Sequence, residues 1–446
     1  LGIEPLTKDV KVDCFYGMQY FRKPPVLVVS YFFFLFVLYW KAPDFIGVSA
    51  TARFDLTRAI VEKHTFKIDD YVSNTIDWAK RDGHYYSVKA PGVSFFAVPF
   101  YWCFYKVQSL RSTELVNIRR VDLFVTALPS VFLSLLFLWF AFSKFPKSEK
   151  QNWLATFAFG VATIALPYST MMWGHQTASA LLFFAVVLLF KQRAPLAVGF
   201  LFSMAVLADY SLAPIGGAFL GWYWFKSKSR IVDLVRFSFG GIPGLLLFAY
   251  YHYSCFGGIL SLPYAFNPMF SEPGTKLFGV LGLPVPEAFW GLLFSLDKGL
   301  FVFSPFLIFS FIGLYRWIKQ KKYRAEAFVV SWIIFSVFWF NLTFNGWGGG
   351  FSIGPRYLVP ILPYLCLGLL YLPKWSMALT ALIAISALNI IVATAVDVQM
   401  PPSIAVFKFA YNELLVNAWA RNYFIQMVVV AAILFGIAAY TPRRQR

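Results

Sequence analysis

The sequence predicts an all-α polytopic membrane protein. Hydrophobic residues make up 59% of the 446 residues and charged residues only 13%, about half of the roughly 25% that a soluble domain carries. Apolar stretches long enough to cross a bilayer recur along the chain. Short runs of Lys and Arg separate many of them, which is typical of cytoplasmic loops. Because a chain this apolar could not cover its surface with polar groups, we expect lipid to be its solvent.

We expect about twelve transmembrane helices in a single domain over residues 1–446. The predicted spans are 26–41, 121–142, 153–170, 175–191, 194–209, 212–226, 235–252, 299–317, 327–341, 357–372, 376–395 and 422–440. The first span precedes an outer loop at 42–120, spans 2–7 occupy 121–252, and a second outer loop covers 253–298. Spans 8–12 occupy 299–440, with outer segments at 342–356 and 396–421, and 441–446 form a tail.

The basic residues of the N-terminal arm, the short loops between spans and the C-terminal tail predict the orientation. With twelve spans, they all fall on one side of the membrane: Lys8, Lys11, Arg22 and Lys23; Lys144, Lys147 and Lys150; Lys191 and Arg193; Lys226, Lys228 and Arg230; Arg316, Lys319, Lys321 and Lys322; Lys374; Arg443, Arg444 and Arg446. By the positive-inside rule this side is cytoplasmic. We therefore expect a multi-pass protein of the plasma (inner) membrane with both termini cytoplasmic and its functional face outside. The net charge of +18 then belongs to membrane loops, and no nucleic-acid partner is expected.

Residues 91–110 form an apolar segment that we do not count as a span. Counting it would reverse either the N-terminal arm or every later basic loop. Its Tyr and Trp residues favour a helix in the outer interface. The four cysteines are far apart, and neither C-x-x-C nor H-E-x-x-H occurs, so neither a disulfide framework nor a zinc site is indicated.

Acidic residues concentrate in the first outer loop. Seven of the 21 lie within 42–90, namely Asp44, Asp55, Glu62, Asp69, Asp70, Asp77 and Asp82. The predicted spans carry almost none, whereas a proton-coupled transporter normally keeps carboxylates at mid-membrane. The polar chemistry is therefore expected on the outer face.

The loop begins TARFDLTRAIVEKHT, which predicts an amphipathic juxtamembrane helix of about three turns. Its charged positions have two interpretations. They form a solvated face held by pairing of Arg58 with Glu62, or Arg53 and Asp55 line a site at the helix start. Further along, Arg81-Asp82-Gly83 predicts a turn.

Three more positions carry open alternatives. Lys89 precedes the interfacial segment, where it could hold a lipid phosphate as a point charge or simply snorkel. His175 lies at an outer membrane boundary, as a packing residue or a functional one. Arg356 follows a glycine-rich segment, NGWGGGFSIGPRYL. Glycines let the backbone approach a ligand closely, and an arginine that follows them suits phosphate or sugar binding. The alternative is a tight turn with an arginine that snorkels to the interface.

Several of these segments resemble the GT-C superfamily of membrane glycosyltransferases, especially bacterial relatives of protein O-mannosyltransferase and of the lipid A aminoarabinose transferase. TARFDL matches the family's acidic-x-Arg-aromatic segment at Arg53 and Phe54. YSVKAPG matches its Tyr-x-x-Lys-x-Pro segment at Tyr86, Lys89 and Pro91. YHYSCFGGILSLPY, DKGLFVFSPFL and GWGGGFSIGPRYLVPILP are similar as well, so the resemblance covers roughly residues 26–365.

The resemblance implies a GT-C bundle that transfers a sugar from a polyprenyl-phosphate donor to an acceptor on the outer face. Base or metal-partner candidates are Asp55, Asp69 and Asp77, and a divalent metal ion is optional in this superfamily. The substrate-binding candidates are Arg53, Tyr86, Lys89, His175 and Arg356, with Arg53, Lys89 and Arg356 assigned to the donor phosphate.

The sequence departs from the family pattern at three places. Ala50 and Thr51 replace acidic residues before Arg53, Val88 stands at an often acidic position, and His175 stands where Asp is frequent. These departures leave a second hypothesis open: a non-catalytic accessory subunit of a larger membrane complex. A lipid or solute transporter is the third, and the acid-poor spans argue against it.

Overall fold

The computed structural model of the chain describes residues 23–41, 47–109, 118–144, 148–268, 277, 280–402 and 404–440. The first half contains α1 (Pro25–Lys41), α2 (Val48–Lys63), η2 (Asp69–Asn74), β1 (Trp78–Arg81), β2 (His84–Ser87), α3 (Gly92–Ser109), α4 (Ile118–Asp122), the π-helix η3 (Leu123–Ala127), α5 (Leu128–Lys144), α6 (Glu149–Val161), α7 (Ala165–Tyr168), α8 (His175–Phe190), α9 (Pro195–Ala208), η4 (Tyr210–Ile215) and α10 (Gly216–Lys226).

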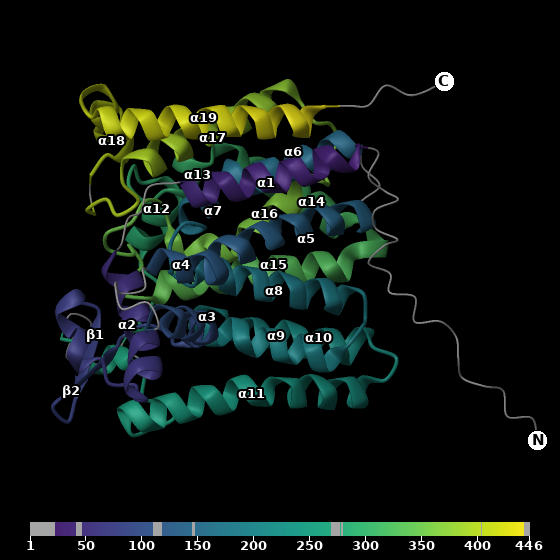
Figure 1. Ribbon diagram of the computed structural model, residues 1–446. Helices are drawn as coiled ribbons and strands as arrows, with labels where there is room; N and C mark the ends of the chain where they lie inside the picture. The colour runs from purple at the N-terminus through teal and green to yellow at the C-terminus, as the bar shows by residue number, and fades with distance from the viewer. Residues whose placement is uncertain are drawn as a thin grey trace, which may run out of the picture.

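The second half is also helical. It contains α11 (Arg230–Phe256), η5 (Pro263–Phe266), α12 (Pro286–Phe294), α13 (Leu300–Phe303), η6 (Pro305–Leu307), α14 (Ile308–Lys319), η7 (Lys321–Tyr323), α15 (Arg324–Thr343), η8 (Arg356–Ile361), α16 (Leu362–Leu369), α17 (Met377–Val396), α18 (Val406–Val416) and α19 (Ala418–Ala439). The long helices run side by side, with α11 at one edge and α19 at the other (Figure 1).

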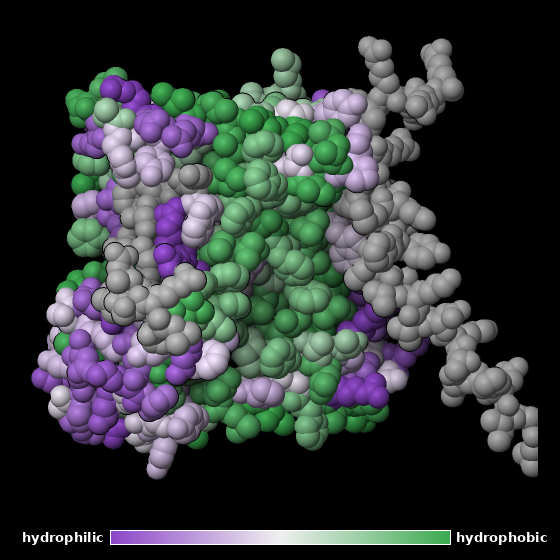
Figure 2. Space-filling model, viewed as in Figure 1, coloured by the Kyte–Doolittle hydropathy of each residue, from purple (hydrophilic) through white to green (hydrophobic). Residues whose placement is uncertain are grey.

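Apolar helices form the body of the molecule, and Figure 2 shows a hydrophobic band between two hydrophilic ends. Among the residues that the structure describes, five helical segments are long and apolar enough to cross a bilayer: Ile118–Lys144, Arg230–Phe256, Lys321–Thr343, Met377–Val396 and Ala418–Ala439. Four shorter apolar helices accompany them: Pro25–Trp40, His175–Phe190, Pro195–Ala208 and Arg356–Leu369. A multi-pass helical membrane protein is thus confirmed, whereas the number twelve stays a prediction.

Helical structure lies at each predicted span, but some spans are interrupted. The segment predicted at 153–170 ends as α6 at Val161 and resumes as α7 at Ala165. The segment at 299–317 is divided into α13, η6 and α14, where Pro305 begins the short 3-10 turn. Proline cannot donate a backbone hydrogen bond and restricts the residue before it. Apolar composition alone did not reveal these breaks.

The first outer loop folds into a compact unit at one end of the bundle, containing α2, η2, a β-hairpin and α3 (Figure 1). The predicted turn at Arg81-Asp82-Gly83 is confirmed, with Asp82 and Gly83 at positive φ. The two strands were not predicted. They pair antiparallel with Trp78 opposite Ser87 and Arg81 opposite His84. A small apolar cluster that includes Leu56, Val88 and Tyr251 packs beneath them.

The turns between α8 and α9 and between α10 and α11 lie at the other end of the bundle, opposite the hairpin (Figure 1). They carry basic residues of the predicted cytoplasmic loops. The predicted N-terminal arm (1–22), the tail (441–446), Lys147 and Asp44 lie outside the described residues. The orientation relative to the cytoplasm remains a prediction.

Glycines hold α11 against α9. A Cβ on Gly199 would lie 1.9 Å from the Phe237 carbonyl oxygen, and a Cβ on Gly240 would lie 1.9 Å from that of Leu196. Only glycine permits such an approach of two helix backbones, as small residues do at membrane helix interfaces. The seam matters for the site because α9 and α11 together supply much of one cavity wall.

Candidate functional site

A cavity of about 620 Å³ lies among α9, α11, α15 and the outer-loop unit. Apolar side chains supply most of its surface, among them Phe202, Val206, Phe237, Leu245, Phe248 and Phe340. Polar side chains also reach it, namely Ser49, Arg53, Lys89, His175, Asp209 and Arg356. An apolar cavity with a few converging polar groups is the usual form of a ligand site.

Arg53 projects from α2 and is only 6% exposed. Its guanidinium donates to the Ser49 carbonyl oxygen at 2.8 Å, and its Nε has no hydrogen-bond partner among the described residues. Burial and the nearby Arg356 charge lower the pKa of Arg53 to about 10, so the group stays protonated at neutral pH. Each interpretation of this helix holds in part: Arg58 pairs with Glu62 at 3.1 Å, and Arg53, but not Asp55, lines the cavity.

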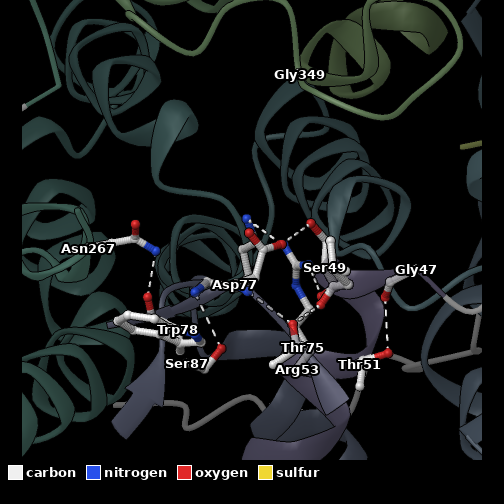
Figure 3. Close-up of polar contacts among 12 residues, drawn as sticks. Gly47, Ser49, Thr51, Arg53, Thr75, Asp77, Trp78, Ser87, Asn267 and Gly349 are labelled. Carbon is white, nitrogen blue, oxygen red and sulfur yellow. Dashed lines mark hydrogen bonds and ion pairs between the residues drawn. The ribbon is translucent and has the colours of Figure 1, made fainter. Parts of the chain in front are cut away.

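The hairpin register brings Lys89 to Asp77. Because Trp78 pairs with Ser87, the residues just outside the pairing lie opposite each other, and the Val88 N–H donates to the Asp77 carbonyl oxygen at 3.2 Å. Lys89 Nζ lies 2.9 Å from Asp77 Oδ2, which also accepts from the Ser49 hydroxyl at 2.5 Å. Figure 3 shows Ser49 linked to both Arg53 and Asp77.

Burial acts on both partners of this ion pair. It lowers the pKa of Lys89 to about 8, with Asp77 opposing the shift and Arg356 and Arg53 adding to it. Burial alone would raise the pKa of Asp77, but the Lys89 ammonium and the Ser49 hydroxyl hold it below its usual value. At neutral pH the pair is therefore charged, with a lysine that is more easily deprotonated than usual.

Arg356 comes from the start of η8, after the glycine-rich segment. Its guanidinium stacks on Trp173 at 4.6 Å and on Tyr357 at 4.8 Å, measured to the ring centroids. It donates to the Tyr357 hydroxyl at 2.9 Å, and within the described part of the chain its Nε has no hydrogen-bond partner. Gly349 has φ +71°, and a Cβ there would lie 3.0 Å from this Nε. The glycine thus makes room for the arginine side chain.

His175 begins α8 directly after Gly174, whose φ is +85°. Its Nδ1 lies 2.8 Å from Oδ2 of Asp209, the residue that ends α9. Asp209 Oδ1 accepts from the backbone N–H and the hydroxyl of Ser211, at 3.1 and 2.7 Å. Sequence reasoning did not single out Asp209. The available signal was its position: Asp209 is an acidic residue at the end of an apolar run, and the predicted spans carry few acidic residues.

The other predicted site residues lie elsewhere. Asp55 is buried in α2 and accepts a 3.3 Å hydrogen bond from Asn74, and burial raises its pKa to about 7. Asp69 holds the hairpin through His84 and the Tyr85 N–H, at 2.7 and 2.6 Å. Tyr86 packs on Phe256. None of these three lines the cavity, and their predicted roles remain predictions.

The candidate metal partners are not gathered in one place. In the part of the chain that the structure describes, no three His, Cys, Asp or Glu side chains are arranged to hold a metal ion. Asp77 and Asp209 are each engaged by a neighbouring basic group. We therefore derive no step through a metal.

The cavity gathers more positive than negative charge. Among the described residues, Arg53, Lys89 and Arg356 supply three cations to the lining, and Asp209, which pairs with His175, supplies one carboxylate. Asp77 pairs with Lys89 but lies outside the lining. A buried charge without a partner costs several kcal/mol. This arrangement therefore suits an anionic ligand with an apolar portion.

Comparisons with known proteins add little to this picture. No protein-family model matches the chain, and no curated protein matches it. Two similar solved structures are those of ArnT from Cupriavidus metallidurans, each 12% identical. The apo structure covers 93% of this chain and 76% of its own, with a TM-score of 0.48. The structure bound to undecaprenyl phosphate covers 93% and 77%, with a TM-score of 0.46. No residue role is carried over from them.

Proposed function

We propose that this protein is a membrane glycosyltransferase that moves a sugar from a polyprenyl-phosphate donor to an acceptor on the periplasmic or extracellular face. The observation that carries the proposal is the placement of Arg53, Lys89 and Arg356 around one cavity whose remaining surface is mostly apolar. A polyprenyl phosphate has the matching chemistry, because it joins an anionic headgroup to a long apolar chain.

The two parts of such a donor use different residues. Arginine presents planar donors to phosphate oxygens, and lysine acts as a point charge. The polyprenyl chain of the donor would lie against Phe202, Phe237 and Leu245. Burial there contributes about 25 cal/mol per Å² of apolar surface. During transfer, negative charge develops on the leaving phosphate, and fixed cations stabilise it.

The proposed outer orientation rests on the two ends of the bundle. The outer-loop unit that supplies Arg53 and Lys89 lies opposite the turns that join α8 to α9 and α10 to α11. Those turns carry Lys191, Arg193 and Lys228, which the positive-inside rule assigns to the cytoplasm. The cavity would then face the outside, with both chain ends inside.

Donor binding is the first test. The purified protein in nanodiscs would be incubated with undecaprenyl phosphate, and the bound lipid would be measured by native mass spectrometry. We expect Arg356→Gln and Lys89→Gln to weaken binding at least ten-fold. Lys80→Gln is the matched control, because Lys80 is exposed on the same hairpin. Equal binding by all four proteins contradicts the donor site.

Turnover then separates the three hypotheses. Undecaprenyl-phosphate-linked sugars of several kinds would be supplied with cell-membrane acceptors, and release of undecaprenyl phosphate would be measured. Release by the wild type supports the enzyme. Binding without release with every sugar points to an accessory subunit. Movement of labelled lipid across sealed vesicles without sugar transfer points to a transporter.

A further inference from the structure

We infer that His175, oriented by Asp209, is the general base that removes the proton from the acceptor hydroxyl. This inference rests on the proposed function and adds a catalytic residue to it. The acidic residues expected before Arg53 are replaced by Ala50 and Thr51, and Asp77 is engaged by Lys89 and Ser49. Removal of the hydroxyl proton therefore needs another side chain, with a free lone pair, beside the three cations.

The geometry assigns the proton on the histidine ring. Asp209 Oδ2 is an acceptor, so the Nδ1 at 2.8 Å carries the hydrogen. In the neutral ring the lone pair is then on Nε2. Among the described residues, Nε2 has no hydrogen-bond partner. The atom is also not completely buried. His175 lines the cavity, and the inference assigns this nitrogen to the acceptor hydroxyl.

The carboxylate is itself fixed. Asp209 ends α9 and begins η4, where its Oδ1 accepts two hydrogen bonds from Ser211. A carboxylate held this way maintains the tautomer and orientation of the imidazole and stabilises the imidazolium after proton transfer, as in other His–Asp pairs. Tertiary structure brings the pair together, because the start of α8 meets the end of the neighbouring α9.

Charged and aromatic groups from several elements surround the ring. Besides Asp209, the charged groups that act on His175 are Arg356 from η8 and Arg53 from α2. The rings of Tyr168 and Tyr357 contact it edge-on, at 6.3 and 5.5 Å between centroids. In the absence of a ligand, the two arginines repel a third positive charge on the ring. A phosphate anion bound to the two arginines neutralises part of their charge. The repulsion then diminishes, and the ring can accept a proton.

The step balances with these groups alone. The acceptor oxygen forms a bond to the anomeric carbon of the donor sugar, while the bond from that carbon to the phosphate oxygen breaks. The electron pair of the broken bond stays on the polyprenyl phosphate, next to the cations. The hydroxyl proton moves to His175 Nε2 and leaves to solvent after the product departs.

The test compares binding with turnover in matched variants. His175→Gln keeps a polar side chain of similar reach but has no basic nitrogen that can accept the hydroxyl proton. We expect it to bind undecaprenyl phosphate within three-fold of the wild type and to lose at least 100-fold in kcat, in line with the usual contribution of a general base. His84→Gln is the control, because His84 also pairs with an aspartate at 2.7 Å but lies outside the cavity.

The pH profile distinguishes a base from a structural residue. The wild-type kcat should fall at acidic pH as the ring becomes protonated. Asp209→Asn removes the anion that favours the protonated ring, so the acid limb should move to lower pH while the rate falls. Loss of lipid binding together with turnover in His175→Gln, or an acid limb unchanged in Asp209→Asn, would overturn the inference.

The outcomes also separate this inference from the proposed function. A wild type that binds donor but never releases polyprenyl phosphate rejects the enzyme and, with it, the base. A wild type that turns over, beside a His175→Gln variant of equal rate, rejects only the base.

Discussion

The ammonium of Lys89 and the carboxylate of Asp77 form a buried ion pair at 2.9 Å, reinforced by the Ser49 hydroxyl. The pair joins the two ends of the hairpin to the start of α2. Lys89 faces the cavity, while Asp77 stands behind it as the counter-charge. Asp77 is therefore better suited to positioning Lys89 than to accepting a proton.

Asp77→Asn should destabilise the empty protein, because it leaves a buried cation among others of the same sign. Breaking a buried pair costs about 3–5 kcal/mol. Undecaprenyl phosphate should restore much of the lost thermal stability by supplying a new anion. Thermal unfolding with and without the lipid measures both effects. A variant of unchanged stability that has lost all turnover would instead support Asp77 as the base.

Donor binding should weaken as the pH rises through about 8. The pKa of Lys89 lies near that value in the ligand-free protein, because burial lowers it. Below this pH, Lys89 is already an ammonium group that can hold the phosphate. Above this pH, Lys89 must first take up a proton, and the free-energy cost of that protonation weakens binding. Lys89→Arg should keep its affinity up to a higher pH, since guanidinium stays charged. Titrations of undecaprenyl phosphate from pH 6.5 to 9.5 test this, and parallel curves for both proteins would contradict it.

Asp55 should affect the pH dependence of stability. Its pKa rises on burial to about 7, from an unfolded value near 3.8. Between these values the folded state holds more protons than the unfolded state, so this residue makes stability fall as the pH rises from about 4 to 7. Asp55→Asn should flatten that part of the curve and stabilise the protein relative to the wild type at pH 8. A variant that is less stable at pH 8, or that keeps the wild-type slope, would contradict this account.

The α9–α11 seam should tolerate no side chain at Gly240. An added methyl group would lie 1.9 Å from the Leu196 carbonyl oxygen, whereas at the neighbouring Gly241 the closest atom is 4.0 Å away. Gly240→Ala should cost about 1–3 kcal/mol through overpacking and weaken donor binding by displacing the cavity wall. Gly241→Ala should keep the wild-type melting temperature, because the added methyl group meets no close neighbour. Equal melting temperatures for the two variants would show that the helices separate freely.

Lys298 should control the position of Arg356. The lysine is 2% exposed, and its ammonium donates to the carbonyl oxygens of Gly350 and Ser352 and to the Ser352 hydroxyl. The same loop carries Gly349, which packs against Arg356. Lys298→Met should weaken undecaprenyl phosphate binding about ten-fold although Lys298 is not among the cavity-lining residues. Lys322→Met, at an exposed position, is the control, and equal affinities would contradict the coupling.

The sequence by itself determined the membrane class and the region of the site. Apolar runs and basic turns are local signals of partition between lipid and water, so they are readable without a fold. Arg53, Lys89, His175 and Arg356 were identified from local motifs, and all four line the cavity. The motifs did not reveal that Asp55, Asp69 and Tyr86 are not among the lining residues.

Tertiary structure decided which of these polar groups meet. The contact of Asp77 with Lys89 depends on strand register, and that of His175 with Asp209 depends on the antiparallel packing of α8 against α9. Residues 34 positions apart in the chain carry no local signal of their contact. The breaks within predicted spans were also hidden, because hydropathy measures affinity for lipid, whereas backbone hydrogen bonding decides where a helix ends.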